Sequence, residues 1–228
     1  MKTAIAILLA ALLASQPAGA EEDRRDQISF DVQSVAEVGN DLLVAVLYAR
    51  EEGRDPRAVA ERVNRAAAWG VQRAKAAADI EVETLDYRTQ PLYERNGQLS
   101  GRWRISQSIR LQSGDSAALS ELLGELQERL ALQSLDYQLS PERRGAAEDE
   151  LIATALARFR QRAELVAESM GAAGYRVLQV DINTPRGGQR PMMLRSAAMA
   201  DAAPGPAIEA GDQRVQVQLR GSIRLLRD

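Results

Sequence analysis

The sequence predicts an α+β protein in which a largely antiparallel sheet is packed by three helices. Three observations favour this class: apolar residues alternate with a period of two in several segments, they recur at helical spacing in three others, and turn residues separate the segments. The expected order is two β-hairpins, each followed by a helix, and then strand, helix, strand, loop and strand. Strands and helices that alternate in this way, with hairpins, are typical of α+β folds.

The first hairpin and its helix occupy the beginning of this pattern. Apolar and polar residues alternate over 28–32, residues 38–41 are typical of a tight turn, and residues 42–48 form a more continuously apolar strand. Asp55 and Pro56 then supply an N-cap and a first-turn proline for the helix. Its stripe consists mostly of small residues: Val59, Val63, Ala66, Gly70, Ala74 and Ala77.

The second hairpin is predicted from residues 82–93 and 102–111, which flank Asn96 and Gly97 in a type I′ turn. Pro91 cannot donate to a ladder, so it marks a bend or an edge strand. The returning strand has an apolar face of Trp103, Ile105, Ile109 and Leu111 and a polar face of Arg102, Arg104, Ser106 and Arg110. The helix that follows is capped by residues 113–115, with a stripe of Leu119, Leu122, Leu126 and Leu130. A short strand ends this half, through Leu135, Tyr137 and Leu139.

The third helix is expected to begin at Ser140 and Pro141 and to end at Gly171 or Gly174. Its predicted stripe is Ile152, Leu156, Phe159, Ala163, Val166 and Met170. This spacing fits a heptad seam or a helix lying on a sheet, and we favour the sheet. Alternating strands follow: Leu178, Val180 and Ile182 in one, and Val215, Val217, Leu219, Ile223 and Leu225 in the other. Residues 186–212, rich in Gly, Pro and Ala, are predicted to be a flexible loop between them.

The composition excludes several kinds of site. The chain has no Cys and no His, which rules out disulfides, thiol nucleophiles, a Ser-His-Asp triad and His-containing zinc sites. We therefore expect no enzyme, and we assign no catalytic, cofactor-binding or metal-ligating residue. Met192, Met193 and Met199 of the predicted loop have thioether groups, which can bind Cu(I) or react with oxidants. We favour the simpler explanation that they have no function and lie in an unconstrained, Ala-rich loop.

The first twenty residues are typical of a secretory signal peptide. Lys2 gives a positive start, residues 4–14 form an apolar run, and Ala18 and Ala20 fit the small-x-small pattern of signal peptidase, with cleavage before Glu21. The run is too short to span a bilayer, so we expect no transmembrane segment. A bacterial lipoprotein would need a Cys after the signal, and the chain has none. The predicted location is therefore the periplasm.

The charge of the exported part argues against nucleic acid as a partner. Without Lys2, 28 basic residues face 32 acidic ones, which gives a net charge of −4. The arginines on the polar strand faces could meet phosphate-bearing lipid at the envelope, although a solvated sheet face explains them better and a subunit interface is the next option.

Several motifs resemble those of the SIMPL-domain family. Residues 89–93 with 100–103 look like the family's second hairpin, residues 162–167 look like its helix that closes on Gly171, and residues 215–217 fit its last strand. The family comprises bacterial exported proteins of poorly defined function, often linked to oxidative-stress defence or described as outer-membrane immunogens. The resemblance implies a periplasmic α+β protein that assembles into rings or other homo-oligomers. The family's opening Thr/Ser-Gly-x-Gly strand is absent; the sequence of residues 32–37 stands there instead.

These observations together predict the organisation and two kinds of function. After the signal peptide we expect a short acidic tail at 21–27 and a domain at 28–228, either single or divided into lobes at 28–139 and 140–228. The favoured function is that of a non-enzymatic, self-assembling periplasmic protein with a role in envelope or oxidative-stress tolerance. The alternative is a module that binds a small molecule under the 186–212 loop, or a protein partner of unknown identity at a sheet edge.

Overall fold

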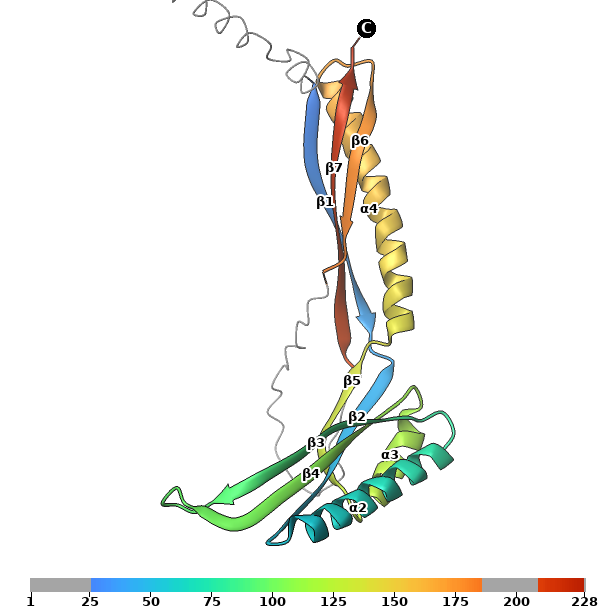
Figure 1. Ribbon diagram of the computed structural model, residues 1–228. Helices are drawn as coiled ribbons and strands as arrows, with labels where there is room; N and C mark the ends of the chain where they lie inside the picture. Colours follow the sequence, from blue (N-terminus) through green and yellow to red (C-terminus); the bar gives the residue numbers. More distant parts are fainter. Residues whose placement is uncertain (1–25, 186–208, 228) are drawn as a thin grey trace, which may run out of the picture. The chain divides into compact units, whose positions relative to one another are not determined.

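The computed structural model describes residues 26–185 and 209–227, and these residues form two compact units (Figure 1). Within the described residues, unit 1 comprises 26–35, 148–185 and 216–227, and unit 2 comprises 36–147 and 209–215. The described residues contain three helices and seven strands in two antiparallel sheets, which confirms the α+β class. The prediction did not anticipate that the strands would divide between two sheets.

Unit 1 is built on a three-stranded sheet with one long helix on it (Figure 1). The strands are β1 (Gln27–Gly39), β6 (Gly174–Asn183) and β7 (Asp212–Leu226), in the order β1-β7-β6. The helix is α4 (Pro141–Ser169), and it ends as predicted near Gly171, which has a φ of +65°. Strand β7 alternates as expected, because its odd-numbered residues from Val215 on are buried and most of the even-numbered ones are more exposed.

The core of unit 1 depends on one aromatic side chain of α4. Phe159 is fully buried, and its ring stacks on Phe30 with 4.7 Å between the centroids. The Cβ of any residue replacing Gly221 would lie 2.4 Å from the Phe159 ring, so β7 needs a glycine there. The buried stripe of α4 is Leu151, Ala155, Phe159, Ala163 and Ala167. Four of the six residues of the predicted stripe are therefore wrong. A straight helix on a sheet buries one narrow row with a spacing of four, and Ile152, Leu156, Val166 and Met170 lie beside that row.

Unit 2 is built on a four-stranded sheet whose order is β3-β4-β2-β5. Its strands are β2 (Leu42–Gly53), β3 (Glu81–Tyr93), β4 (Leu99–Ser113) and β5 (Ala131–Gln138). Helices α2 (Pro56–Ala76) and α3 (Ser116–Leu126) pack on one face, as Figure 1 shows. Both helices begin where the sequence predicts, since the carboxylates of Asp55 and Asp115 accept hydrogen bonds from the first backbone N–H groups.

The core of unit 2 is aliphatic and lies between the sheet and the two helices. All four leucines of the predicted stripe are buried, but only Leu119, Leu122 and Leu126 lie on α3, because the helix ends at Leu126 and Leu130 follows it. The small residues of α2 allow a close approach: a Cβ at Gly70 would lie 2.6 Å from Leu130. Other buried members come from β2 and β4, namely Leu43, Ala45, Leu47, Ala49, Ile105, Ile109 and Leu111.

The predicted first hairpin is wrong, because β1 and β2 belong to different sheets. Residues between them do not make a hairpin turn: Asn40 N donates to the carbonyl of Gly211 (3.0 Å), and its side chain donates to the carbonyl of Ala210 (2.7 Å). The physical reason is visible in the patterns. The strictly alternating β1 suits a sheet covered on one face, whereas the continuously apolar β2 suits the interior of a larger sheet.

The second hairpin, β3 and β4, is confirmed, and β3 with Pro91 is an edge strand. The predicted type I′ turn is wrong, since it needs positive φ at both central residues and only Gly97 has one, at +82°. Gly97 N donates to the carbonyl of Glu94 (3.0 Å), and Glu94 N donates to the carbonyl of Gln98 (2.8 Å). This is a type I turn followed by a left-handed glycine, the usual three-residue hairpin.

Some of the predicted features lie outside the described residues. They include the signal peptide with Ala18, Ala20 and Glu21, and the three methionines of the 186–212 loop, of which only residues 209–212 are described. The expected lobes, 28–139 and 140–228, differ from the observed units because the first half of β1 joins the C-terminal strands rather than the segment that follows it.

Candidate functional site

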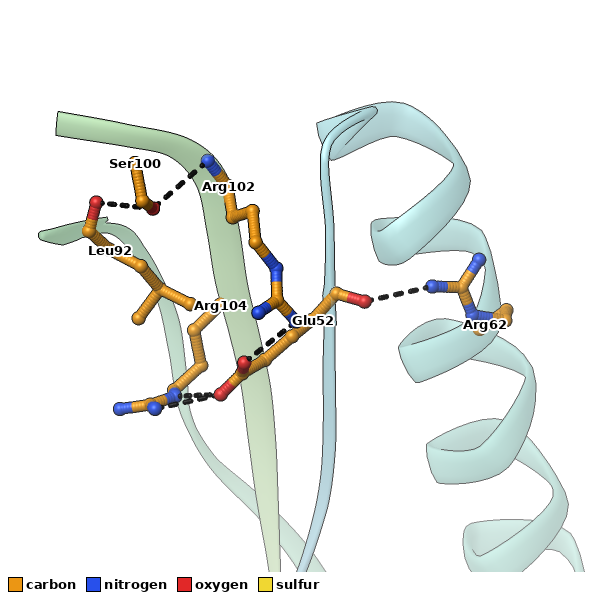
Figure 2. Close-up of polar contacts among 6 residues, drawn as sticks. All are labelled: Glu52, Arg62, Leu92, Ser100, Arg102 and Arg104. Atoms are coloured by element: carbon orange, nitrogen blue, oxygen red, sulfur yellow. Dashed lines mark hydrogen bonds and ion pairs between the residues drawn. The ribbon is translucent and has the colours of Figure 1, made fainter. Parts of the chain in front are cut away.

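One polar network of unit 2 gathers around Glu52, at the end of β2 (Figure 2). Its carboxylate accepts hydrogen bonds from Arg104 Nε (2.7 Å) and Arg102 Nη2 (3.2 Å). Arg104 is the cross-strand partner of Glu52, so the register of β2 and β4 produces the pair directly. The backbone carbonyl of Glu52 also accepts a bond from Arg62 Nη2 of α2, at 3.5 Å.

The chemistry of this network is that of an ion-pair cluster. Two guanidinium groups surround one carboxylate, and both oxygens of Glu52 are engaged by them. Ser100 lies beside it: its hydroxyl donates to the carbonyl of Leu92 (2.8 Å) and accepts a bond from Arg102 N (3.3 Å). A hydroxyl whose proton is given to a carbonyl has no base to activate it. The arrangement fixes the second hairpin to β2 and offers no nucleophile.

The free edge of β1 in unit 1 is closed by two arginines of α4. Arg158 Nη1 donates to the carbonyl of Gln33 (2.8 Å), and Arg162 Nη1 donates to the carbonyl of Asp31 (3.0 Å). Four residues of helix advance about 6 Å and two residues of strand about 6.6 Å, so each arginine meets alternate carbonyls. An open groove of about 530 Å³ lies along this contact. Two carbonyls in the middle of β1, those of Asp31 and Gln33, are therefore already hydrogen-bonded and less available to a further strand.

The opposite edge of the same sheet, β6, is open. Its apolar side chains are partly exposed: Val177 by 43%, Leu178 by 36% and Ile182 by 44%. Within the described residues, no side chain or backbone N–H donates to the outer carbonyls of β6. Leu178 sits in a β-bulge, because the pairing with β7 shifts between Val177 and Gln179. An apolar edge with unpaired backbone groups is able to pair with another strand.

Asp41 is the one carboxyl group in the described residues whose pKa is clearly shifted. Burial acts to raise its pKa, but hydrogen bonds from Ser140 N and Ser140 Oγ, both 2.8 Å, and the charge of Arg143 together hold it below its ordinary value. The same Ser140 hydroxyl accepts a hydrogen bond from Arg143 N (3.2 Å), as an N-cap of α4 does. Asp41 therefore stabilises the start of α4 in its charged form.

Residues 26–185 and 209–227 lack two further features. No group of three or more Asp, Glu, His or Cys side chains is placed to hold a metal ion. No helix there combines the length and the apolar character that a membrane span requires.

Sequence reasoning found part of these features. It placed Arg102 and Arg104 on one polar strand face, but it missed Glu52, since their meeting depends on the register of two strands far apart in the sequence. It also missed the contact of Arg158 and Arg162 with β1; their spacing of four on a helix was the available signal. The residues Ala18, Ala20 and Glu21 remain predictions, because they lie outside the described part of the chain.

Comparison with known proteins identifies the family. No curated protein is significantly similar to the chain. Among solved structures, the de novo designed protein Foldit4 is 15% identical with a TM-score of 0.25, over 43% of this chain and 98% of that one. A putative amidohydrolase/peptidase from Burkholderia cenocepacia is 12% identical with a TM-score of 0.26, over 47% of this chain and 30% of that one. A family model described as SIMPL, a protein of unknown function (DUF541), matches residues 28–223, and the chain therefore belongs to the SIMPL family.

Proposed function

We propose that the protein is an exported, non-catalytic periplasmic protein that self-assembles through the open edge of β6, with a role in envelope or oxidative-stress tolerance. The observation that carries the assembly is the difference between the two edges of the unit 1 sheet. Two carbonyls of β1 accept hydrogen bonds from Arg158 and Arg162, whereas the edge strand β6 exposes apolar side chains and unpaired backbone groups. Exposed strand edges of this kind are usually protected unless they pair with something.

The export part of the proposal is supported by the N-terminal sequence. A positive residue, an apolar run and the Ala18-x-Ala20 pattern precede the acidic start at Glu21. The non-catalytic part is supported by the absence of His and Cys from the whole sequence and by the occupied state of Glu52 and Ser100. The stress role is supported only by the family resemblance.

Light scattering of the purified protein across a concentration series tests the assembly. We expect a mass above that of one chain at micromolar concentration, and a single-chain mass for the double variant Val177→Lys with Ile182→Lys. Lysines on an edge strand oppose pairing because each approaching strand would have to desolvate them. Leu165→Lys is the matched control, since Leu165 is also apolar and exposed in unit 1 but lies on α4.

Two outcomes would overturn the assembly proposal. One is a single-chain mass for the unsubstituted protein at every concentration, and the other is an assembly that survives the double lysine variant. The alternative function, binding of a separate protein partner by strand addition, is favoured by the same edge. It would be indicated by a single-chain mass together with a partner that co-purifies with the unsubstituted protein and is lost in the lysine variant.

A further inference from the structure

A small polar pocket lies on the face of the four-stranded sheet that is turned away from α2 and α3. Its volume is about 130 Å³, and its lining includes Tyr48 and Arg50 of β2 and Ser106 and Ser108 of β4. Pockets that take drug-sized molecules measure roughly 300–1,000 Å³, so this pocket has room for one small group only. We call it the outer-face pocket.

The two serines make the hollow in the sheet surface. Ser106 and Ser108 point to the same face as Arg104 and Arg110, because side chains alternate along a strand. In the register with β2, Ser106 is opposite Arg50 and Ser108 is opposite Tyr48. The two short serine side chains therefore lie between the longer Arg104 and Arg110 along β4. They also lie opposite the longer Arg50 and Tyr48 of β2. Ser108 forms the floor and is only 8% exposed.

Irregularities in both outer strands turn further side chains toward this spot. In β3, Leu85 and Asp86 together face the single residue Ser108, which is a β-bulge. In β5, Gln133 is an extra residue where the pairing with β2 shifts between Val46 and Leu47. All three of these bulge residues line the pocket. Bulges often occur beside binding sites, where they redirect a side chain, and here two separate bulges flank one pocket.

The serine hydroxyls and the Arg50 guanidinium of the pocket remain available to bind a ligand. In the part of the chain that the structure describes, the Ser106 and Ser108 hydroxyls have no hydrogen-bond partner, and Arg50 has no carboxylate partner. The Arg50 guanidinium stacks over the Tyr48 ring at 4.6 Å, which orients it without neutralising it. The one carboxylate of the lining, Asp86, is already paired with Arg88. The pocket thus carries a net positive charge and unused hydroxyl donors.

We infer that the outer-face pocket binds one small oxyanion, a phosphate or a carboxylate group. The Arg50 guanidinium supplies the charge and a planar set of donors, and the Ser106 and Ser108 hydroxyls supply neutral donors from the floor. The Asp86–Arg88 ion pair lines one side of the pocket. The volume admits either a free anion or the end group of a larger molecule.

Equilibrium dialysis of the purified protein against radiolabelled inorganic phosphate tests this inference. We expect saturable binding of one phosphate per chain at constant ionic strength. Arg50→Gln should weaken it by about tenfold or more, because a hydrogen bond to a charged group is lost. Ser108→Val should have a similar effect by filling the floor and removing its donor. Arg110→Gln is the matched control: it removes a guanidinium from the same face of β4, outside the lining, and should leave the affinity unchanged.

Competition experiments define the source of the anion. Displacement by acetate as well as by phosphate would indicate a site for any oxyanion group, whereas displacement only by phosphate and its monoesters would restrict it to phosphate. Two results would overturn the inference: no saturable binding of either phosphate or acetate, or an equal loss of binding in Arg50→Gln and Arg110→Gln. Arg50 is exposed, so its variant remains informative even if Ser108→Val fails to fold.

Discussion

The two sheets of this protein are covered by helices in different ways, and the difference explains which sheet edge remains exposed. The four-stranded sheet receives two helices, and its core is spread over many aliphatic side chains. Among the described residues, the three-stranded sheet is covered by one helix, α4, whose buried row is three alanines, one leucine and Phe159. A single narrow helix cannot shield both edges of a sheet. In unit 1 its arginines close β1, and β6 stays open.

The largest expected effect comes from removing Phe159, the buried aromatic side chain of α4. Phe159→Ala should lower the free energy of unfolding by about 3–5 kcal/mol, since the flanking members of the buried row, Ala155 and Ala163, are too small to fill the cavity. Urea unfolding followed by circular dichroism measures the change. The control Leu165→Ala, at an exposed position of the same helix, should stay within about 0.5 kcal/mol of the unsubstituted protein. Similar costs at the two positions would show that the core of unit 1 does not depend on Phe159.

A smaller effect is expected from filling the space that Phe159 uses. Gly221→Ala should destabilise unit 1 by about 1–3 kcal/mol, because the new Cβ would meet the Phe159 ring at 2.4 Å and the Gln179 carbonyl at 3.0 Å. Adding Phe159→Leu to Gly221→Ala should recover part of the loss, which a double-mutant cycle by urea unfolding measures. Strictly additive effects would contradict the proposed contact.

In unit 2, Asp41 makes stability depend on pH. Its pKa is lowered in the folded protein, so its contribution is present above the pKa of the unfolded chain and is lost as the pH falls through the folded value. Asp41→Asn should cost about 1 kcal/mol at neutral pH, as the loss of a capping interaction does. The difference in stability between the Asp41→Asn variant and the unsubstituted protein should become smaller at acidic pH. Thermal unfolding between neutral and acidic pH checks this, and a difference that stays constant would contradict it.

The smallest effect on stability, and the sharpest test of the two edges, comes from the arginines of α4. Replacing Arg158 and Arg162 together by Ala should cost less than about 0.5 kcal/mol per residue, since both side chains are exposed. It should nevertheless increase association, because the carbonyls of Asp31 and Gln33 become available. Arg160→Ala on the same helix is the control, and light scattering is the measurement. An unchanged mass would show that the arginines do not protect β1.

The sequence predicted the features that depend on residues close together in the chain. It did not predict the features that depend on which strands pair and in which register. The caps at Asp55 and Asp115 and the burial of the leucine stripe are local signals, and all are confirmed. The first hairpin was wrong because a turn at residues 38–41 says where a strand ends and not which strand it pairs with. Neither the polar network around Glu52 nor the pocket around Ser108 was predictable. Each contains residues from different strands, and the hydrophobic pattern of one strand does not specify its register with another.

Hydrogen–deuterium exchange at low and high protein concentration is the most direct measurement of the open edge. If chains pair through β6, peptides that cover Gly174–Asn183 become protected as the concentration rises, while peptides of β1 change little. The same peptides of the Val177→Lys with Ile182→Lys variant should stay unprotected. Protection of β6 that is independent of concentration, or that appears instead in β1, would contradict the account.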